Sequence, residues 1–187
     1  TILRERYRQI FPTAVLFSAG LIWIGFLLDE PGNIITGLYR IVVSENILIT
    51  DYVYIAGPGA ALINSGIVTG ISICILKFSG ASFNGDTIVK MGLMSGFSLF
   101  GKNFFNIWPI ILGSWLYAKY RKRPFSRYAS VALLSTSLAP LVSYMTFGSK
   151  YASVPLELLS GVVIGFVLPS LSSYTYKIQN GMNLYNM

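Results

Sequence analysis

The chain has 187 residues, of which 53% are apolar and only 11% are charged, and its mean hydropathy is +0.62. Soluble domains carry about 25% charged residues, so this composition excludes a disordered chain, a coiled coil and a typical cytosolic enzyme. Fourteen lysines and arginines face seven acidic residues, and the charges lie between long apolar runs. We therefore expect an all-α, multi-pass membrane protein that has the lipid bilayer as a partner and binds no nucleic acid.

The residue types that are absent or rare in the sequence exclude several kinds of catalytic and metal site. The chain contains no histidine, and Cys74 is its single cysteine. Zinc sites, iron–sulfur clusters, His-ligated haem and Ser-His-Asp triads all need several such residues, and no glycine-rich phosphate loop is present. We therefore expect no metal, no cofactor and no enzymatic activity.

Four uncharged intervals are long enough to cross a hydrocarbon layer as helices, which takes about 20 residues. They are residues 9–28, 52–76, 128–149 and 158–176. The first interval ends without a small-residue cleavage site, which distinguishes it from a signal peptide. These intervals predict four long membrane spans.

Two shorter apolar blocks, residues 87–101 and 103–118, lie on either side of Lys102. At about 1.5 Å per residue, each reaches roughly 22–24 Å as a helix, which is less than a full crossing. They predict a hairpin of two short spans or a re-entrant pair. Residues 32–50 have apolar side chains at helical spacing and predict a short helix at the membrane interface, with a structured loop as the alternative.

The basic residues indicate the orientation, because cytoplasmic loops are enriched in lysine and arginine. If the N-terminus is cytoplasmic and residues 87–118 enter and leave on one side, only Arg40 and Lys150 lie outside. Ten basic residues then lie inside: Arg4, Arg6, Arg8, Lys77, Lys119, Arg121, Lys122, Arg123, Arg127 and Lys177. We therefore expect a cell-membrane protein whose N-terminus is cytoplasmic and whose 87–118 segment forms a hairpin.

The chain also resembles itself. Residues 65–70 (SGIVTG) match residues 160–165 (SGVVIG), and weaker matches pair 84–91 with 180–187 and 4–21 with 121–138. These matches predict a parallel internal repeat with units 1–120 and 121–187. The second unit stops early, so we expect the chain to be a piece of a longer protein.

The repeated segment carries two GxxxG pairs, formed by Gly66 and Gly70 and by Gly161 and Gly165. Such pairs let two helix backbones approach closely. Packing inside the chain is one interpretation, and contact between copies in a homo-oligomer is the other.

Residues 100–110 (FGKNFFNIWPI), and residues 168–169 (LP) followed by 181–186 (GMNLYN), carry a family resemblance. They resemble an uncharacterised family of bacterial multi-pass membrane proteins, known as domain of unknown function 1576. The resemblance extends over nearly the whole chain, as the N-terminal part of a longer protein. It implies an integral membrane protein with many helices, and it implies no substrate, cofactor or catalytic residue.

Two lysines lie in or beside the short blocks, Lys90 near the start of the first and Lys102 between the two. A lysine at the centre of a membrane helix costs about 2.5–3.5 kcal/mol, so such a residue usually faces a cavity or a partner. There it would attract an anionic solute or lipid headgroup. The alternative is that both lysines snorkel to the membrane surfaces.

Three asparagines are further candidates for binding a substrate. Asn103 and Asn106 follow Lys102, and Asn103 could cap the second block so that its amides hold an anion. Ordinary capping and packing is the alternative. Asn64 follows Gly57-Pro58-Gly59, a sequence that could break a helix near the membrane midplane, as in transporter sites. The alternative is an ordinary membrane helix, in which glycine and proline are also common.

Two carboxylates are candidates for proton or ion coupling. Asp86 precedes the first short block, where an N-cap is the alternative role, and Glu157 lies near Lys150, where an interfacial carboxylate is the alternative. Taken together, these features predict a transporter or channel for a small polar solute, with an anion favoured. A membrane protein with a packing or assembly role and no transport activity is the competing class.

Overall fold

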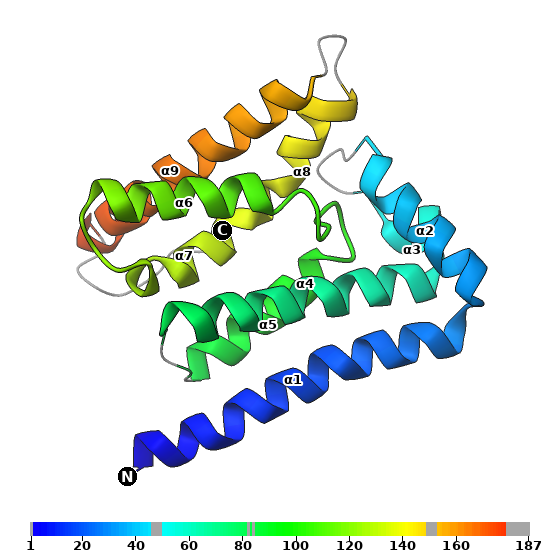
Figure 1. Ribbon diagram of the computed structural model, residues 1–187, viewed down its shortest axis with the longest axis horizontal. Coiled ribbons are helices and arrows are strands. Elements are labelled where there is room, and N and C mark those ends of the chain that lie inside the picture. Colours follow the sequence, from blue (N-terminus) through cyan, green and yellow to red (C-terminus); the bar gives the residue numbers. More distant parts are fainter. Residues whose placement is uncertain (1, 46–49, 82, 84, 149–152, 179–187) are drawn as a thin grey trace.

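The computed structural model describes residues 2–45, 50–81, 83, 85–148 and 153–178, and within them the chain is helical (Figure 1). The α-helices are α1 (Ile2–Leu28), α2 (Pro31–Val43), α3 (Tyr52–Ala56), α4 (Pro58–Ser79), α5 (Gly85–Phe97), α6 (Trp108–Tyr120), α7 (Ala129–Ser135), α8 (Ala139–Ser143) and α9 (Val154–Ile178). Three short 3-10 or π turns accompany them: Phe125–Arg127, Thr136–Leu138 and Tyr144–Gly148. The all-α prediction is confirmed.

Helices α1 and α4 form a close antiparallel pair. A Cβ atom on Gly25 would lie 2.7 Å from the carbonyl oxygen of Gly59, and one on Gly66 would lie 2.9 Å from that of Ser18. The hydroxyl of Ser18 donates a hydrogen bond of 2.8 Å to the carbonyl oxygen of Gly66. Glycine at these positions therefore lets the two backbones approach more closely than any larger residue would allow.

Helices α6 and α9 form a second pair of the same kind. A Cβ atom on Gly165 would overlap the carbonyl oxygen of Ile110, and one on Gly113 would overlap that of Val162. The hydroxyl of Ser114 donates to the carbonyl oxygen of Gly165 at 2.8 Å, as Ser18 does to Gly66. The predicted close approach at the GxxxG pairs is confirmed, and in both pairs it is made inside the chain. The repeat itself stays a prediction.

Two of the four expected spans are helices long and apolar enough to cross a membrane, Gln9–Leu28 and Pro58–Ser79. The expected span 52–76 is not continuous, because Gly57 has a φ of 88° and Pro58 has no N–H group to continue the helix. Helix α3 therefore ends at Ala56, and α4 begins a new helix.

The expected span 128–149 is also interrupted, into α7, α8 and the short turns beside them. The hydroxyls of Ser135 and Thr136 bond to carbonyls of the preceding turn, and Pro140 lacks an N–H group. Shorter apolar helices remain at Ala129–Ser143 and Leu158–Ser172. By length and composition, α1 and α4 are the candidate spans among the described helices, and the four spans stay a prediction.

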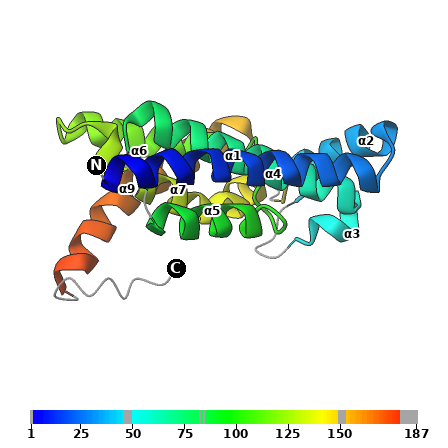
Figure 2. The same ribbon diagram turned by 90° about the horizontal axis from the view of Figure 1, so that it is seen from below.

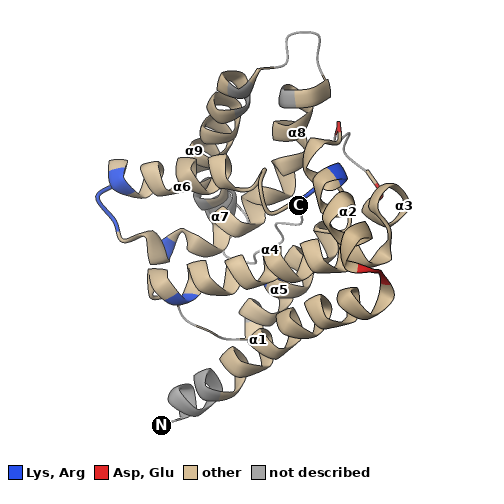
Figure 3. Ribbon diagram, turned by 45° about the vertical axis from the view of Figure 1, so that its right-hand side comes forward, with Lys and Arg blue, Asp and Glu red and all other residues tan. Residues whose placement is uncertain are grey.

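Helices α5 and α6 form an antiparallel hairpin whose connecting loop, residues 98–107, packs against the first turns of α4 (Figure 1). Both open ends of the hairpin lie at the end of the molecule that carries Lys77, Lys119 and Arg121–Arg127, which we name the basic end (Figure 3). Asp29, Glu30 and Asp51 lie at the opposite end, which we name the acidic end and which also carries Arg40 (Figure 3). The hairpin thus leaves the basic end and returns to it.

The segment between the first two long helices contains α2, so the predicted short helix is confirmed over the structured loop. Helices α2 and α3 lie together at the end of the molecule farthest from the N-terminus (Figure 2). Ile41 and Tyr52 are fully buried there against Ala60 and Ala61 of α4. These two short helices therefore cover the hairpin loop from the acidic end.

Candidate functional site

The loop between α5 and α6 is not helical, yet its polar residues are buried. Ser98 and Asn103 are 0% exposed, and Lys102 and Asn106 are 1% exposed. Buried backbone outside a helix needs hydrogen-bond partners for its N–H and C=O groups. In this loop the partners come from three asparagine side chains and from the helices around them.

Asn64 holds the loop against α4. Its Nδ2 donates to the carbonyl oxygens of Ser98 (2.7 Å) and Lys102 (3.0 Å), and its Oδ1 accepts from the N–H of Phe104 (3.2 Å). One buried side chain therefore satisfies three backbone groups of the loop.

Asn103 and Asn106 fold the loop back on itself. The Oδ1 of Asn103 accepts from the N–H groups of Phe105 and Asn106, and the Oδ1 of Asn106 accepts from the N–H of Asn103. The reciprocal arrangement is that of a capping box. It forms one turn before α6, whose own N-cap is Ile107.

The predicted role of Asn103 is corrected by this geometry. Asn103 does not cap α6, and the N–H groups of residues 105 and 106 already bond to its own side chain. Those amides therefore have no capacity left to hold an anion. The remaining donors tie the loop to its neighbours, from Asn103 Nδ2 to Ile41 O (3.3 Å) and from Asn106 Nδ2 to Ser143 Oγ (2.8 Å).

The side-chain amine of Lys102 is buried in the loop without an oxygen acceptor or a counter-charge among the described residues. Its Nζ lies 3.1 Å from the sulfur of Met94 and 5.5 Å from the centre of the Phe97 ring, and it forms no ion pair with a carboxylate of the described residues. Lys102 lies outside the two candidate spans, and burial lowers its pKa to about 7. The alternative that Lys102 snorkels to a surface is wrong, because the whole side chain is enclosed.

The other candidates lie apart from this loop. Lys90 is half-buried in the second turn of α5, toward the basic end. Asp86 lies in the first turn of α5 and Glu157 in the first turn of α9, but the side chains of both lie outside the described part of the structure. Their predicted coupling and capping roles therefore stay predictions.

Buried hydroxyl groups extend the polar region beyond the residues that the sequence singled out. The Oγ of Ser65 lies 2.8 Å from the carbonyl oxygen and 2.9 Å from the Oγ of Ser95, and Thr136 Oγ1 lies 3.6 Å from the same Met94 sulfur that Lys102 contacts. The signal for part of this set was present in the sequence. Ser65, Thr69 and Ser72 follow Asn64 at helical spacing within an otherwise apolar interval, and all three are buried.

Comparison with known proteins identifies a family. Residues 30–187 match the model of the family described as "Protein of unknown function (DUF1576)". No curated protein and no solved structure matches the chain. The matched residues include α2 to α9 and the buried loop around Lys102. The chain therefore belongs to the family of proteins of unknown function DUF1576.

Proposed function

We propose that this chain is part of an integral, multi-pass protein of the cell membrane that moves a small polar solute, preferably an anion, across the bilayer. The N-terminus and the basic end face the cytoplasm in this proposal. Lys102 supplies the charge that recognises the solute. The observation that carries the proposal is the enclosed amine of Lys102, which has no carboxylate partner in the described residues.

The outer surface of the helices supports a membrane location. In α1, Leu16, Trp23 and Leu27 are 71%, 68% and 69% exposed, and in α9 Leu159 is 62% exposed. Apolar faces of this extent would be costly in water and are favourable against lipid. The described charges lie mainly at the two ends of the molecule, where headgroups and water would meet them (Figure 3).

The hairpin supports a transport role within that membrane. Non-helical backbone is tolerated at membrane depth only where protein or a water-filled cavity surrounds it. The bonds made by Asn64, Asn103 and Asn106 meet that requirement for the loop, which leaves Lys102 beside it as an ionisable residue. Ionisable residues inside membrane proteins are functional candidates by default, because their burial is costly.

The proposed mechanism follows from the charge of Lys102. In its ammonium form the residue lacks a counter-charge, and an anionic solute entering beside it would provide one. The solute would displace the weak contact with the Met94 sulfur. Helices α2 and α3 cover the loop from the acidic end through Ile41 and Tyr52, so passage requires these helices to move.

A packing or assembly role without transport remains the second candidate. It is favoured by the asparagines, whose side-chain groups are engaged within the protein and hold the loop together. In that case the burial of Lys102 would follow from the packing of the loop and would have no role in binding a solute. Solute flux distinguishes the two candidates.

The test is flux into liposomes that contain the purified chain, with chloride, nitrate, acetate and phosphate as probes. We expect flux of at least one probe above that of empty liposomes, and a loss of about tenfold or more in Lys102→Met, because a charge-assisted contact contributes about 1.5–3 kcal/mol. Lys119→Met is the matched control, because Lys119 is an exposed lysine in the last turn of α6, and it should keep the wild-type rate. Absence of flux for all four anions, or an unchanged rate in Lys102→Met, would overturn the proposal.

A further inference from the structure

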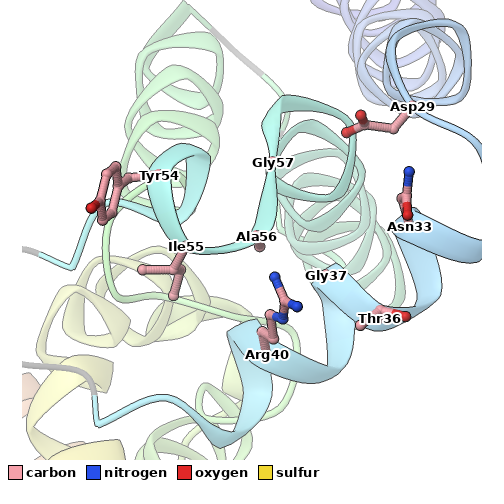
Figure 4. A pocket seen from close by; sticks show the side chains of 9 residues that line it. All are labelled: Asp29, Asn33, Thr36, Gly37, Arg40, Tyr54, Ile55, Ala56 and Gly57. Atoms are coloured by element: carbon pink, nitrogen blue, oxygen red, sulfur yellow. The ribbon is translucent and has the colours of Figure 1, made fainter.

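A pocket of about 240 Å³ opens at the acidic end of the molecule, away from Lys102 (Figure 4). It lies between Asp29 after α1, the face of α2 that carries Asn33, Gly37 and Arg40, and the break that separates α3 from α4. Polar and charged groups dominate its lining: the side chains of Asp29, Asn33, Thr36 and Arg40 and the backbone of Ala56 and Gly57.

The pocket owes its shape to the break at Gly57 and to a close approach of α2. A Cβ atom on Gly37 would lie 2.5 Å from the carbonyl oxygen of Ala56, so α2 packs directly against the end of α3. Asp29 is held on the other wall, because its Oδ2 accepts a 2.7 Å hydrogen bond from the N–H of Gly59. The carboxylate is therefore fixed in position, and its Oδ1 accepts no hydrogen bond from the described residues.

The two charges of the pocket are opposite and separate. Asp29 and Arg40 lie on different sides of the opening, with Asn33 beside Asp29 and the guanidinium of Arg40 directed toward Ala56 (Figure 4). Within the described part of the chain, neither residue takes part in an ion pair, and Arg40 donates no hydrogen bond. Both charges are therefore available to a ligand.

The pair of charges selects the class of ligand. An anion that met Arg40 would be repelled by Asp29, and a cation that met Asp29 would be repelled by Arg40. A molecule that carries both charges would match both walls at once. The volume lies below the roughly 300–1,000 Å³ that is typical of sites for drug-sized ligands, so the molecule must be small.

We propose that this pocket binds a small zwitterion of the α-amino acid class. The planar guanidinium of Arg40 receives the carboxylate, a geometry in which arginine can donate two parallel hydrogen bonds. Asp29 Oδ1 accepts from the ammonium group, with the Asn33 side chain beside it. The proposal concerns binding at the acidic end and is independent of transport through Lys102.

The test measures binding to the purified chain in detergent by calorimetry. Glycine, L-alanine and L-serine are the zwitterionic probes, while propionate and ethylamine each present one half of L-alanine. We expect saturable binding of the amino acids and binding about tenfold or more weaker for the two half-molecules, since each lacks one charge-assisted contact. This comparison uses the wild-type chain alone, so no variant has to fold.

Two variants then assign the charges. Asp29→Asn keeps an oxygen that can accept from the N–H of Gly59 while it removes the negative charge, and Arg40→Gln removes the positive charge. Each should weaken L-alanine binding about tenfold or more, whereas Glu30→Gln, a neighbour that does not line the pocket, should leave it unchanged.

Three results would overturn the proposal: no binding of any of the three amino acids, propionate binding as tight as that of L-alanine, or wild-type affinity in both Asp29→Asn and Arg40→Gln. The flux experiment has a separate outcome. Anion flux that depends on Lys102 can be present without amino-acid binding at Asp29 and Arg40, and the reverse also holds.

Discussion

At the scale of single residues, the buried polar groups differ in how well their burial is compensated by hydrogen bonds. Asn64 satisfies three backbone groups of the loop, so its burial is compensated by hydrogen bonds. The amine of Lys102 has only a thioether sulfur and an aromatic ring near it, and neither replaces water around an ammonium group. Lys102 is therefore a source of instability whenever it carries its charge.

The first prediction concerns the pH dependence of stability. The folded pKa of Lys102 is about 7 and the unfolded value about 10.5, so between these values the unfolded chain binds a proton that the folded chain does not. Raising the pH from 7 to 9.5 should therefore increase the free energy of unfolding, by about 3 kcal/mol for this group. Lys102→Met should lack this contribution and should be more stable than wild type at pH 7.

Thermal unfolding in detergent at several pH values checks this expectation through the difference between the two proteins. Lys119→Met serves as the control, because Lys119 is an exposed lysine in the last turn of α6. Parallel pH profiles for wild type and Lys102→Met would show that Lys102 meets a compensating partner in the folded protein.

The sequence identified Lys102 and the three asparagines because polar residues stand out in an apolar stretch. The hydrogen-bonding roles of these residues could not be predicted from the sequence in the same way. Whether Asn103 caps α6 or closes a turn before it depends on where the helix begins, and the helix begins at Trp108. The contacts of Asn103 with Ile41 and of Asn106 with Ser143 join residues far apart in the chain, so no local pattern predicts them.

At the scale of helices, glycine decides which pairs pack closely. In α4 and α9, glycines face carbonyl oxygens of a neighbouring helix, whereas Gly20 of α1 has open space where a Cβ atom would lie. The same residue type therefore has different consequences in different helices. The GxxxG spacing predicts a close helix contact, and the structure shows which helix makes it.

The second prediction tests this distinction. Gly165→Ala should lower the free energy of unfolding by about 1–3 kcal/mol, because the new methyl group overlaps the carbonyl oxygen of Ile110 and the two helices must separate. Gly20→Ala, the matched control, should be neutral or stabilising by up to about 1 kcal/mol through helix propensity. Thermal unfolding of both variants in detergent gives the comparison, and equal effects at the two sites would contradict the packing of α6 on α9.

Helix boundaries were predictable where one strong local signal dominates. The end of α1 at Leu28, where the uncharged interval also ends, is of this kind. At Gly57-Pro58 the sequence indicates only a possible break within the interval 52–76, which we expected to be one span, and the structure shows two helices there. The interruption of residues 129–148 was missed, because serine and threonine hydroxyls that bond to the preceding turn are also common within intact helices. Apolar composition alone gives the length of an interval and does not show where its helix is divided.

At the scale of the whole molecule, most described lysines and arginines lie at one end of the helices, and the described acidic residues lie mainly at the other end, together with Arg40 (Figure 3). Lys77 lies in the last turn of α4 and Lys119 in the last turn of α6, both at the basic end, while Asp29 follows α1 at the acidic end (Figure 3). The start of α5 and the end of α6 both lie at the basic end. In the proposed membrane, a hairpin of this form would enter and leave on one side, whereas a single crossing would put residues 77 and 121 on opposite sides.

The last prediction uses that difference. In a Cys74→Ser background, single cysteines at Ser79 and Arg121 should react with a membrane-impermeant maleimide only from the cytoplasmic side of sealed vesicles. A cysteine at Glu30 should react only from the outer side, because it follows α1 at the acidic end. Both cytoplasmic positions are needed, since each alone is compatible with several topologies. Labelling of positions 79 and 121 from opposite sides would show that the 85–120 segment crosses once, and the hairpin around Lys102 would then not be re-entrant.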